Sequence, residues 1–184
     1  MHTPDTRRER PAWPVAENFM PDFTLPCVDE QTVQTVDYHS PAHDHDRRGL
    51  ILLFLGEHRA DHRSKTADDL LLDLARHYEQ IVGASAEVLA VVRGTLWEAA
   101  QIKQDSRLPF PLLADEDGQV HRDYGATTPD GRSACEAVYV AGRFGKIYLS
   151  SRASDGPPLP TARVILGSIY FIESRCPECG TEEL

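Results

Sequence analysis

A run of six apolar residues that ends abruptly in a polar segment constrains the fold of this chain most strongly. Residues 50–55, LILLFL, are continuously apolar, which is typical of a strand buried on both faces of a parallel sheet. They lead into GEHRADHRS, and KTADDLLLDLARHYEQIV then follows with apolar residues at helical spacing. We therefore expect a buried strand, an exposed turn and a helix, an arrangement in which many α/β proteins place functional side chains.

The remaining sequence predicts further strands and helices. We expect a hairpin or two edge strands in FMPDFTLPCVDEQTVQTVDYH, a buried strand in AEVLAVVRG, a helix in TLWEAAQIKQDS, a loop with one helical turn in LPFPLLADEDGQVHRDYGA, a hairpin in EAVYVAGRFGKIYLS and a final helix in TARVILGSIYFIESR. The strand–helix–strand unit implies parallel strands, and the second hairpin implies antiparallel strands at one edge. The expected fold class is α/β, with a mixed sheet of five to seven strands and helices on both faces.

Apolar side chains at helical spacing indicate which residues enter the core. Six of them fall on one side of a single helix after the turn: Leu70, Leu71, Leu74, Tyr78, Ile81 and Val82. We also expect the large aromatic side chains of Trp97 and Phe110 in the core, because such side chains bury the most apolar area.

Length and charge favour one globular domain with short extensions. The chain of 184 residues suffices for a layered core, which we place at residues 17–175, between a flexible arm at 1–16 and a tail at 176–184. The formal net charge of −10 argues against binding to nucleic acid or to an anionic membrane. We find neither an apolar run of about 20 residues nor a secretory signal, so we expect a cytoplasmic protein.

Five segments, in the same order along the chain, resemble the peroxiredoxins of the alkyl hydroperoxide reductase and thiol-specific antioxidant family. PDFTLPCVDEQTVQTVDY is similar to the family's opening, LILLFLG to the strand before its active site, and SAEVLAVVRG to another of its strands. The most specific segment is LPFPLLADEDGQVHRDYGA, which is similar to lpFpLLsDpdgevaraYGv, and AVYVAGRFGKIYLS resembles a following hairpin. The resemblance covers residues 21–151 and implies a thioredoxin-like fold with antioxidant or thiol–disulfide chemistry.

The turn after the first buried strand departs from the family's reactive segment, PxxxTxxC, in which the Cys attacks peroxide. With the strands aligned, the Pro, Thr and Cys positions are Gly56, Ala60 and Arg63. In the thioredoxin alignment, the two cysteine positions are Arg59 and His62. Peroxide reduction needs a thiolate, and neither Arg nor His can form a sulfenic acid, so we expect no peroxidase activity from this turn.

The second half of the family's active site is also altered. With Gly145 aligned, the family's Arg before the hairpin, or the cis-Pro of thioredoxins, falls near Glu136 and Ala137. Cys135 precedes these residues, so it is either the thiol nearest to the site or a small buried residue at the start of a strand. We assign no role to Cys27.

The polar side chains of the turn offer another use for it. His58, Arg59, His62 and Arg63 at a helix N-terminus favour binding of a carboxylate, sulfate, phosphate or protein partner. The alternative is that the arginines pair with neighbouring acidic residues. Together with the three histidines of residues 39–45, the turn also has a composition that suits zinc, copper or nickel, although such loops are commonly solvated surface.

The C-terminal motif CPEC contains the remaining two cysteines, Cys176 and Cys179. This spacing can close a disulfide, so the pair can act as a redox acceptor or resolving pair. CPECG also has the shape of one zinc knuckle, although a structural zinc needs two further ligands from histidines or from another chain. A third interpretation is a pair of reduced surface thiols.

The sequence supports two functional hypotheses. The first is a divergent peroxiredoxin-like antioxidant or thiol–disulfide oxidoreductase that lacks the usual active-site Cys and relies on Cys176 and Cys179. The second is a non-catalytic thioredoxin-fold binding or scaffold protein, with an anion or partner site at residues 58–63 and CPEC as a metal or dimer contact. We expect no required cofactor, CPEC as a site that can bind zinc, and a second copy of the chain, a thiol reductant or a protein as partner.

Overall fold

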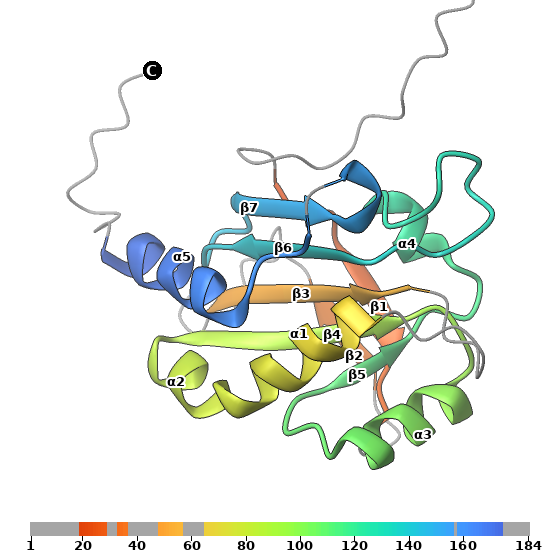
Figure 1. Ribbon diagram of the computed structural model, residues 1–184, viewed down its shortest axis with the longest axis horizontal. Helices are drawn as coiled ribbons and strands as arrows, with labels where there is room; N and C mark the ends of the chain where they lie inside the picture. Colours follow the sequence, from red (N-terminus) through yellow and green to blue (C-terminus); the bar gives the residue numbers. More distant parts are fainter. Residues whose placement is uncertain (1–18, 29–32, 37–47, 57–64, 157, 175–184) are drawn as a thin grey trace, which may run out of the picture.

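The apolar run at residues 50–55 forms the central strand of the main sheet. The computed structural model describes residues 19–28, 33–36, 48–56, 65–156 and 158–174 (Figure 1). The central strand is β3, Gly49–Leu55, and all seven of its residues are buried. It pairs in parallel with β4, Ala86–Val92, and antiparallel with β6, Ala137–Ala141. These two pairings confirm the buried strand that the sequence predicts.

Two further strands complete the main sheet, whose order is β5-β4-β3-β6-β7. β5, Leu112–Ala114, is parallel to β4, and β7, Ile147–Arg152, is antiparallel to β6. β7 lies at the edge of the sheet, as expected for the closing hairpin. The predicted mixed sheet is therefore confirmed.

The side chains of β3 alternate between two hydrophobic cores, one on each face of the sheet. Ile51 and Leu53 contribute to the first core, whereas Leu52 and Phe54 contribute to the second. This alternation is the period of two that a strand imposes on its side chains. Because both faces are covered, the strand is apolar at every position.

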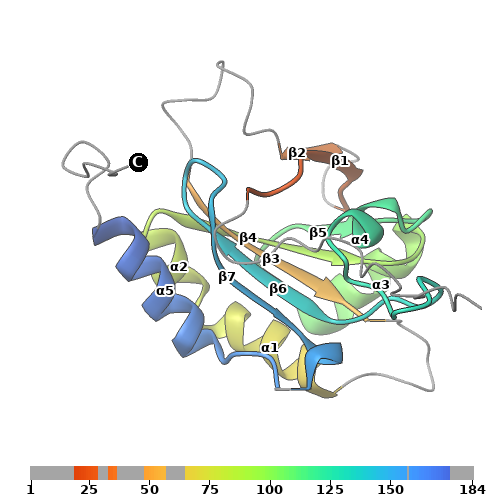
Figure 2. The ribbon, with the colours of Figure 1, turned by 90° about the horizontal axis from the view of Figure 1, so that it is seen from above.

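Helices cover both faces of the sheet, as the fold class requires. The first core lies under α1, Lys65–Arg76, α2, Tyr78–Gly83, α3, Leu96–Ser106, and α5, Ala162–Ser174. The second core lies under α4, Gln119–Asp123, and the hairpin of β1, Phe23–Pro26, and β2, Val33–Val36. Figure 2 shows α1, α2 and α5 on one side of the sheet and the hairpin with α4 on the other. In the part of the chain that the structure describes, no helix has the length and apolarity to cross a membrane.

The structure corrects two of the predicted elements. The segment expected as a loop with a helical turn contains the short strand β5 before α4. The single helix expected after the turn is two helices, α1 and α2, which are separated at His77. The first hairpin is confirmed, and it forms a two-stranded sheet of its own.

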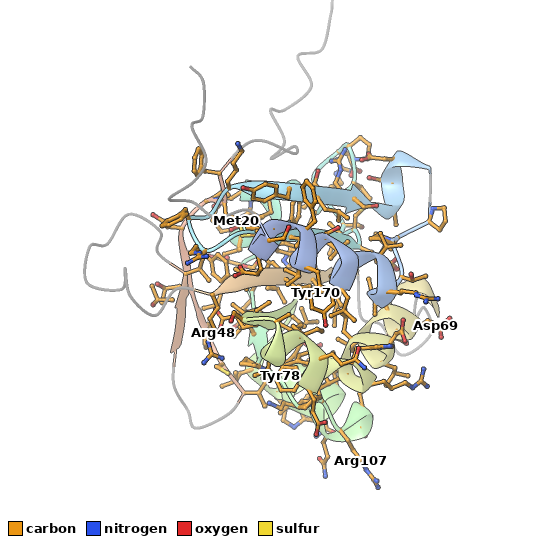
Figure 3. All side chains as sticks on the ribbon, turned by 90° about the vertical axis from the view of Figure 1, so that its left-hand side faces the viewer. Met20, Arg48, Asp69, Tyr78, Arg107 and Tyr170 are labelled. Carbon is orange, nitrogen blue, oxygen red and sulfur yellow. The ribbon has the colours of Figure 1, made fainter. Side chains whose placement is uncertain are left out.

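Two of the expected core positions are wrong. Trp97 on α3 is 70% exposed, and Val82 near the end of α2 is also exposed. Phe110 is buried as expected. The outer face of α5 also carries exposed aromatic side chains, among them Tyr170, which is labelled in Figure 3.

The ends of two helices are fixed by side chains. Thr95 and Glu98 form a capping box at the start of α3, in which each side chain binds the backbone N–H of the other residue. At the start of α5, the backbone N–H of Ala162 donates to Asp73 Oδ2 on α1, 3.3 Å away. This second contact joins α1 to α5 on the same face of the sheet.

Candidate functional site

The three parallel strands β3, β4 and β5 have their carboxyl ends on the same side of the main sheet. The edge that carries the candidate site means this side of the sheet, and not an outer strand such as β7. Gly56 follows β3, Arg93 follows β4, Asp115 follows β5, and Glu136 directly precedes β6. Ligands of open α/β sheets bind outside the carboxyl ends of the strands. This edge is therefore the candidate site, and the polar sequence of residues 57–64 follows Gly56 here.

Asp115 and His121 form a fully buried pair at this edge. The ring Nδ1 of His121 lies 2.6 Å from Asp115 Oδ2, and the backbone N–H of His121 donates to the same oxygen at 2.8 Å. The backbone N–H of Val120 donates to Asp115 Oδ1 at 3.4 Å. On the other side of the ring, Nε2 lies 3.4 Å from the carbonyl oxygen of Leu55, and the ring packs against Phe54 in a T-shaped arrangement.

The hydrogen bonds around Asp115 decide its ionisation. Burial raises the pKa of its carboxyl, because a buried carboxylate loses its hydration. Hydrogen bonds from the ring and the backbone of His121, the charge of that ring and the backbone N–H of Val120 lower the pKa and outweigh burial. The pKa of Asp115 therefore lies below its ordinary value, and the carboxyl is ionised at neutral pH.

Glu136 lies on the other side of the central strand's end. Its side chain is 7% exposed and packs against Gly56, where an added Cβ would lie 3.2 Å from Glu136 Cγ. Gly56 therefore allows the chain to pass close to this carboxylate. The resemblance implies an Arg near this position, so the described edge carries a carboxylate where a cation is expected.

The two cysteines within the described residues are poor nucleophiles in this fold. Cys135 is half-buried, and burial raises the pKa of its thiol more than the nearby charge of Arg152 lowers it, with Glu136 adding to the increase. A thiol with a raised pKa is mostly protonated at neutral pH and is a weak nucleophile. Cys27 is buried in the second core. Cys135 is thus placed beside the site, as one of the two alternatives expected, but without an activated thiol.

Comparison of the sequence with models of protein families shows where this fold belongs. The model described as the AhpC/TSA family matches residues 16–150, which is well over half of the chain and includes β1 to β6. The chain belongs to the AhpC/TSA family. The resemblance on which the expectations of fold and chemical class rest is thereby confirmed.

Solved structures similar to this AhpC/TSA protein have the same fold. AhpC of Mycobacterium tuberculosis has a TM-score of 0.69 at 15% identity, over 91% of this chain and 98% of that chain. AhpC of Enterococcus faecalis has a TM-score of 0.68 at 18% identity, over 89% and 99%. Peroxidoxin BcpB of Mycobacterium tuberculosis has a TM-score of 0.68 at 13% identity, over 86% and 97%. The fold is therefore the thioredoxin-like fold of the peroxiredoxins, whereas no protein with a curated description matches the sequence.

Most side chains predicted for the site of this AhpC/TSA protein lie outside the described residues. They are His58, Arg59, His62 and Arg63 in the turn, the histidines of residues 39–45, and Cys176 and Cys179 after α5. CPEC also lies beyond residue 150, where the family match ends. Within the described ranges, His, Cys, Asp and Glu form no group of three that could hold a metal ion. The roles of the turn and of CPEC stay predictions.

The Asp115–His121 pair is the feature that sequence reasoning missed. Both residues lie in LPFPLLADEDGQVHRDYGA, the segment with the most specific resemblance to the AhpC/TSA family. Asp115 matches the D of the family pattern, but His121 stands where the pattern has a small residue, a. That exchange of a small residue for a titratable one is the signal that could have identified the pair.

Proposed function

We propose that this AhpC/TSA protein is a thiol–disulfide oxidoreductase whose reactive pair is Cys176 and Cys179, rather than a peroxidase that uses the turn after β3. The observation that carries the proposal is the placement of the four cysteines. The family's reactive Cys position holds Arg63, Cys27 is buried in a core, and the thiol of Cys135 has a raised pKa. Only the CPEC pair combines two thiols at a spacing that can close a disulfide.

The proposed reaction is exchange with a disulfide of a small molecule or a protein. One thiolate of the CPEC pair attacks the partner's disulfide, which forms a mixed disulfide and releases one partner thiolate. The second CPEC thiolate then attacks the mixed disulfide, which closes the bond between Cys176 and Cys179 and releases the other partner thiolate. The partner gains two electrons, the released thiolates take up the two protons, and a thiol reductant restores the pair.

The experiment compares thiol content before and after exposure to oxidised glutathione, in the wild-type chain and in the double variant C176S/C179S. We expect the wild type to lose two thiols and to regain them with dithiothreitol, whereas the double variant loses none. Cys135→Ser serves as the matched control and should lose two thiols like the wild type. If the thiol content of the wild type does not change on exposure, or if the double variant loses as many thiols as the wild type, the proposal is contradicted.

The polar turn favours a second function, which is binding without catalysis. Two arginines and two histidines follow Gly56 at the edge where α/β sheets bind ligands, and they suit an anionic group of a small molecule or protein. In this function CPEC contributes ligands to a zinc ion or a contact between two copies of the chain. Metal analysis of protein purified without a tag distinguishes the two functions, since stoichiometric zinc on CPEC excludes a free dithiol.

We also propose a cellular location and an oligomeric state for this protein. The proposed dithiol chemistry needs reduced thiols, and the cytoplasm keeps thiols reduced, so we propose a cytoplasmic location. We further propose a homodimer and a thiol reductant as partners. Mass measurement in solution tests the dimer, and the rate at which candidate reductants restore the CPEC thiols tests the second partner.

A further inference from the structure

Both ring nitrogens of His121 face hydrogen-bond acceptors. Nδ1 lies 2.6 Å from Asp115 Oδ2, and Nε2 lies 3.4 Å from the carbonyl oxygen of Leu55. A neutral imidazole has one donor nitrogen and one acceptor nitrogen, so it can serve only one of these two oxygens. The imidazolium donates from both nitrogens and satisfies both oxygens. The geometry therefore matches the charged form of the ring.

The other contacts of Asp115 exclude the opposite arrangement, in which a neutral carboxylic acid donates to a neutral ring. Its Oδ2 also accepts the backbone N–H of His121, and its Oδ1 accepts that of Val120. Hydrogen bonds to a carboxylate stabilise the anion. The proton between the two side chains is therefore held by the ring, on Nδ1.

The polar groups packed around the pair have partners elsewhere. Phe54 contacts the rings of His121, Tyr124 and Tyr139, whose centroids lie 5.0 to 5.9 Å from its own. The hydroxyl of Tyr124 donates to the carbonyl of Pro21, and that of Tyr139 donates to the carbonyl of Tyr124. On α4 itself, the charged side chains of Arg122 and Asp123 are exposed and bind Gln119. The ring itself contacts the carboxylate of Asp115 and the carbonyl oxygen of Leu55, and the other buried carboxylate at these strand ends is Glu136, which packs against Gly56.

We propose that His121 is a positioning residue: paired with Asp115 as a buried imidazolium, it fixes the carbonyl of Leu55 and so the direction in which the chain leaves β3. The pair joins the ends of three strands, because the backbone N–H of Asp115 also donates to the carbonyl of Val92, 2.9 Å away. The turn that carries the candidate site begins one residue after Leu55. The proposal concerns this strand end alone and holds whether or not CPEC is the reactive pair.

The direct test is nitrogen NMR of the histidine rings in the full-length, isotope-labelled protein at neutral pH. We expect both ring nitrogens of His121 to give the signal of protonated nitrogens, and Asp115→Asn to convert one of them to the unprotonated signal. His77 is the matched control, because its Nδ1 donates to the carbonyl of Asp73 from a half-buried ring, outside this site. His121→Gln and His77→Gln assign the signals. An unprotonated nitrogen on His121 in the wild type would overturn the proposal.

Amide hydrogen exchange tests the positioning itself. We expect His121→Ala to raise the exchange rates of the Leu55 and Gly56 amides by about tenfold. Without the contact between the His121 ring and the carbonyl of Leu55, the end of the strand opens more often. The amides of β7, on the far edge of the sheet, should exchange as in the wild type, and His77→Ala should leave the end of β3 unchanged. Equal exchange at the end of β3 in His121→Ala and wild type would overturn the positioning role. If His121→Ala does not fold, the ring signals of the wild type remain decisive.

Discussion

The carboxylate of Asp115 accepts three hydrogen bonds inside the protein, and this makes the stability of the fold sensitive to acid. Its pKa is lower in the folded chain than in the unfolded chain. The contribution to stability is therefore complete above the ordinary pKa of an aspartate and is lost as the pH falls through the lowered folded value. We expect Asp115→Asn to reduce the free energy of unfolding by about 3 kcal/mol at neutral pH, since it leaves the His121 ring without its charged partner.

Urea unfolding at several pH values measures this contribution. The difference between wild type and Asp115→Asn should shrink steadily as the pH is lowered through the acid range. Asp69→Asn, at an exposed position on α1, should leave the free energy of unfolding unchanged. A difference that is the same at neutral and acid pH would show that the ionisation of Asp115 does not stabilise the fold.

Gly118 permits the tight connection between β5 and α4. Its φ is +69°, and an added Cβ would lie 2.9 Å from Nε of Arg93. Because this left-handed conformation is strained for other residues, Gly118→Ala should lower the free energy of unfolding by about 1 to 2 kcal/mol in a denaturant titration. Gly83→Ala is the control, since an added Cβ there meets nothing within 4 Å and should leave stability unchanged or higher. If Gly118→Ala and Gly83→Ala are equally stable, the left-handed conformation at Gly118 does not require glycine.

Among the helices and strands, the capping box of α3 makes a measurable contribution to the free energy of unfolding. Thr95 Oγ1 accepts the N–H of Glu98 at 3.3 Å, and the carboxylate of Glu98 accepts the N–H of Thr95 at 2.7 Å. Thr95→Ala removes one of these bonds and should lower the free energy of unfolding by about 1 kcal/mol. Thr95→Ser keeps the hydroxyl and should be close to wild type. If the two substitutions are equally destabilising, the hydroxyl does not act as a cap.

The elements with strong periodicity could be predicted from the sequence, and the others depended on tertiary contacts. β3 and the hairpin of β6 and β7 were predicted because continuous apolar runs and a Gly-containing turn are local signals. β5 was missed because its three residues follow two prolines that indicate a loop. It becomes a strand only through pairing with β4, in which Ala90 lies opposite Leu112.

The helices show two further features that the spacing of apolar residues does not predict. Trp97 was expected in the core because of its size, but the buried face of α3 is formed by Ala99 and Ile102, and Trp97 lies on the opposite side. The break between α1 and α2 occurs at His77, whose ring Nδ1 donates to the carbonyl of Asp73 at 2.8 Å. The backbone N–H of His77 also donates to this oxygen, at 3.2 Å, and the pattern of apolar residues does not indicate the additional side-chain donor.

At the scale of the whole molecule, the sequence predicted the strand end at which we place the candidate site, but not the buried pair beside it. The edge at Gly56 follows from a buried parallel strand that ends in a polar turn. His121 departs from the family pattern, which is a signal in the sequence, but its pairing with Asp115 is a tertiary contact, because the compact connection between β5 and α4 brings the two side chains within 2.6 Å. The side chains of residues 57–64 and CPEC lie outside the described residues, so their predicted roles await experiment.

The whole molecule has the fold of a peroxiredoxin, and we propose that its reactive thiols lie outside the edge where β3 ends. The described part of that edge carries Asp115 and Glu136, and the thiol of Cys135 beside it has a raised pKa. If the edge still reduced peroxide, Cys135 would have to be the thiol. We therefore expect Cys135→Ser to leave the rate of peroxide consumption unchanged in the presence of dithiothreitol. A clear loss of peroxide consumption in this variant would show that the reactive thiol is Cys135, beside the strand ends, and not a thiol of CPEC.

Mapping the disulfide by mass spectrometry tests the central claim most directly. The reduced full-length protein is treated with oxidised glutathione, free thiols are blocked at acid pH, and the peptides that contain each of the four cysteines are identified. The account predicts a bond between Cys176 and Cys179, with Cys27 and Cys135 blocked as free thiols. Recovery of all four cysteines as free thiols, or oxidation at Cys135 with Cys176 and Cys179 free, would contradict it.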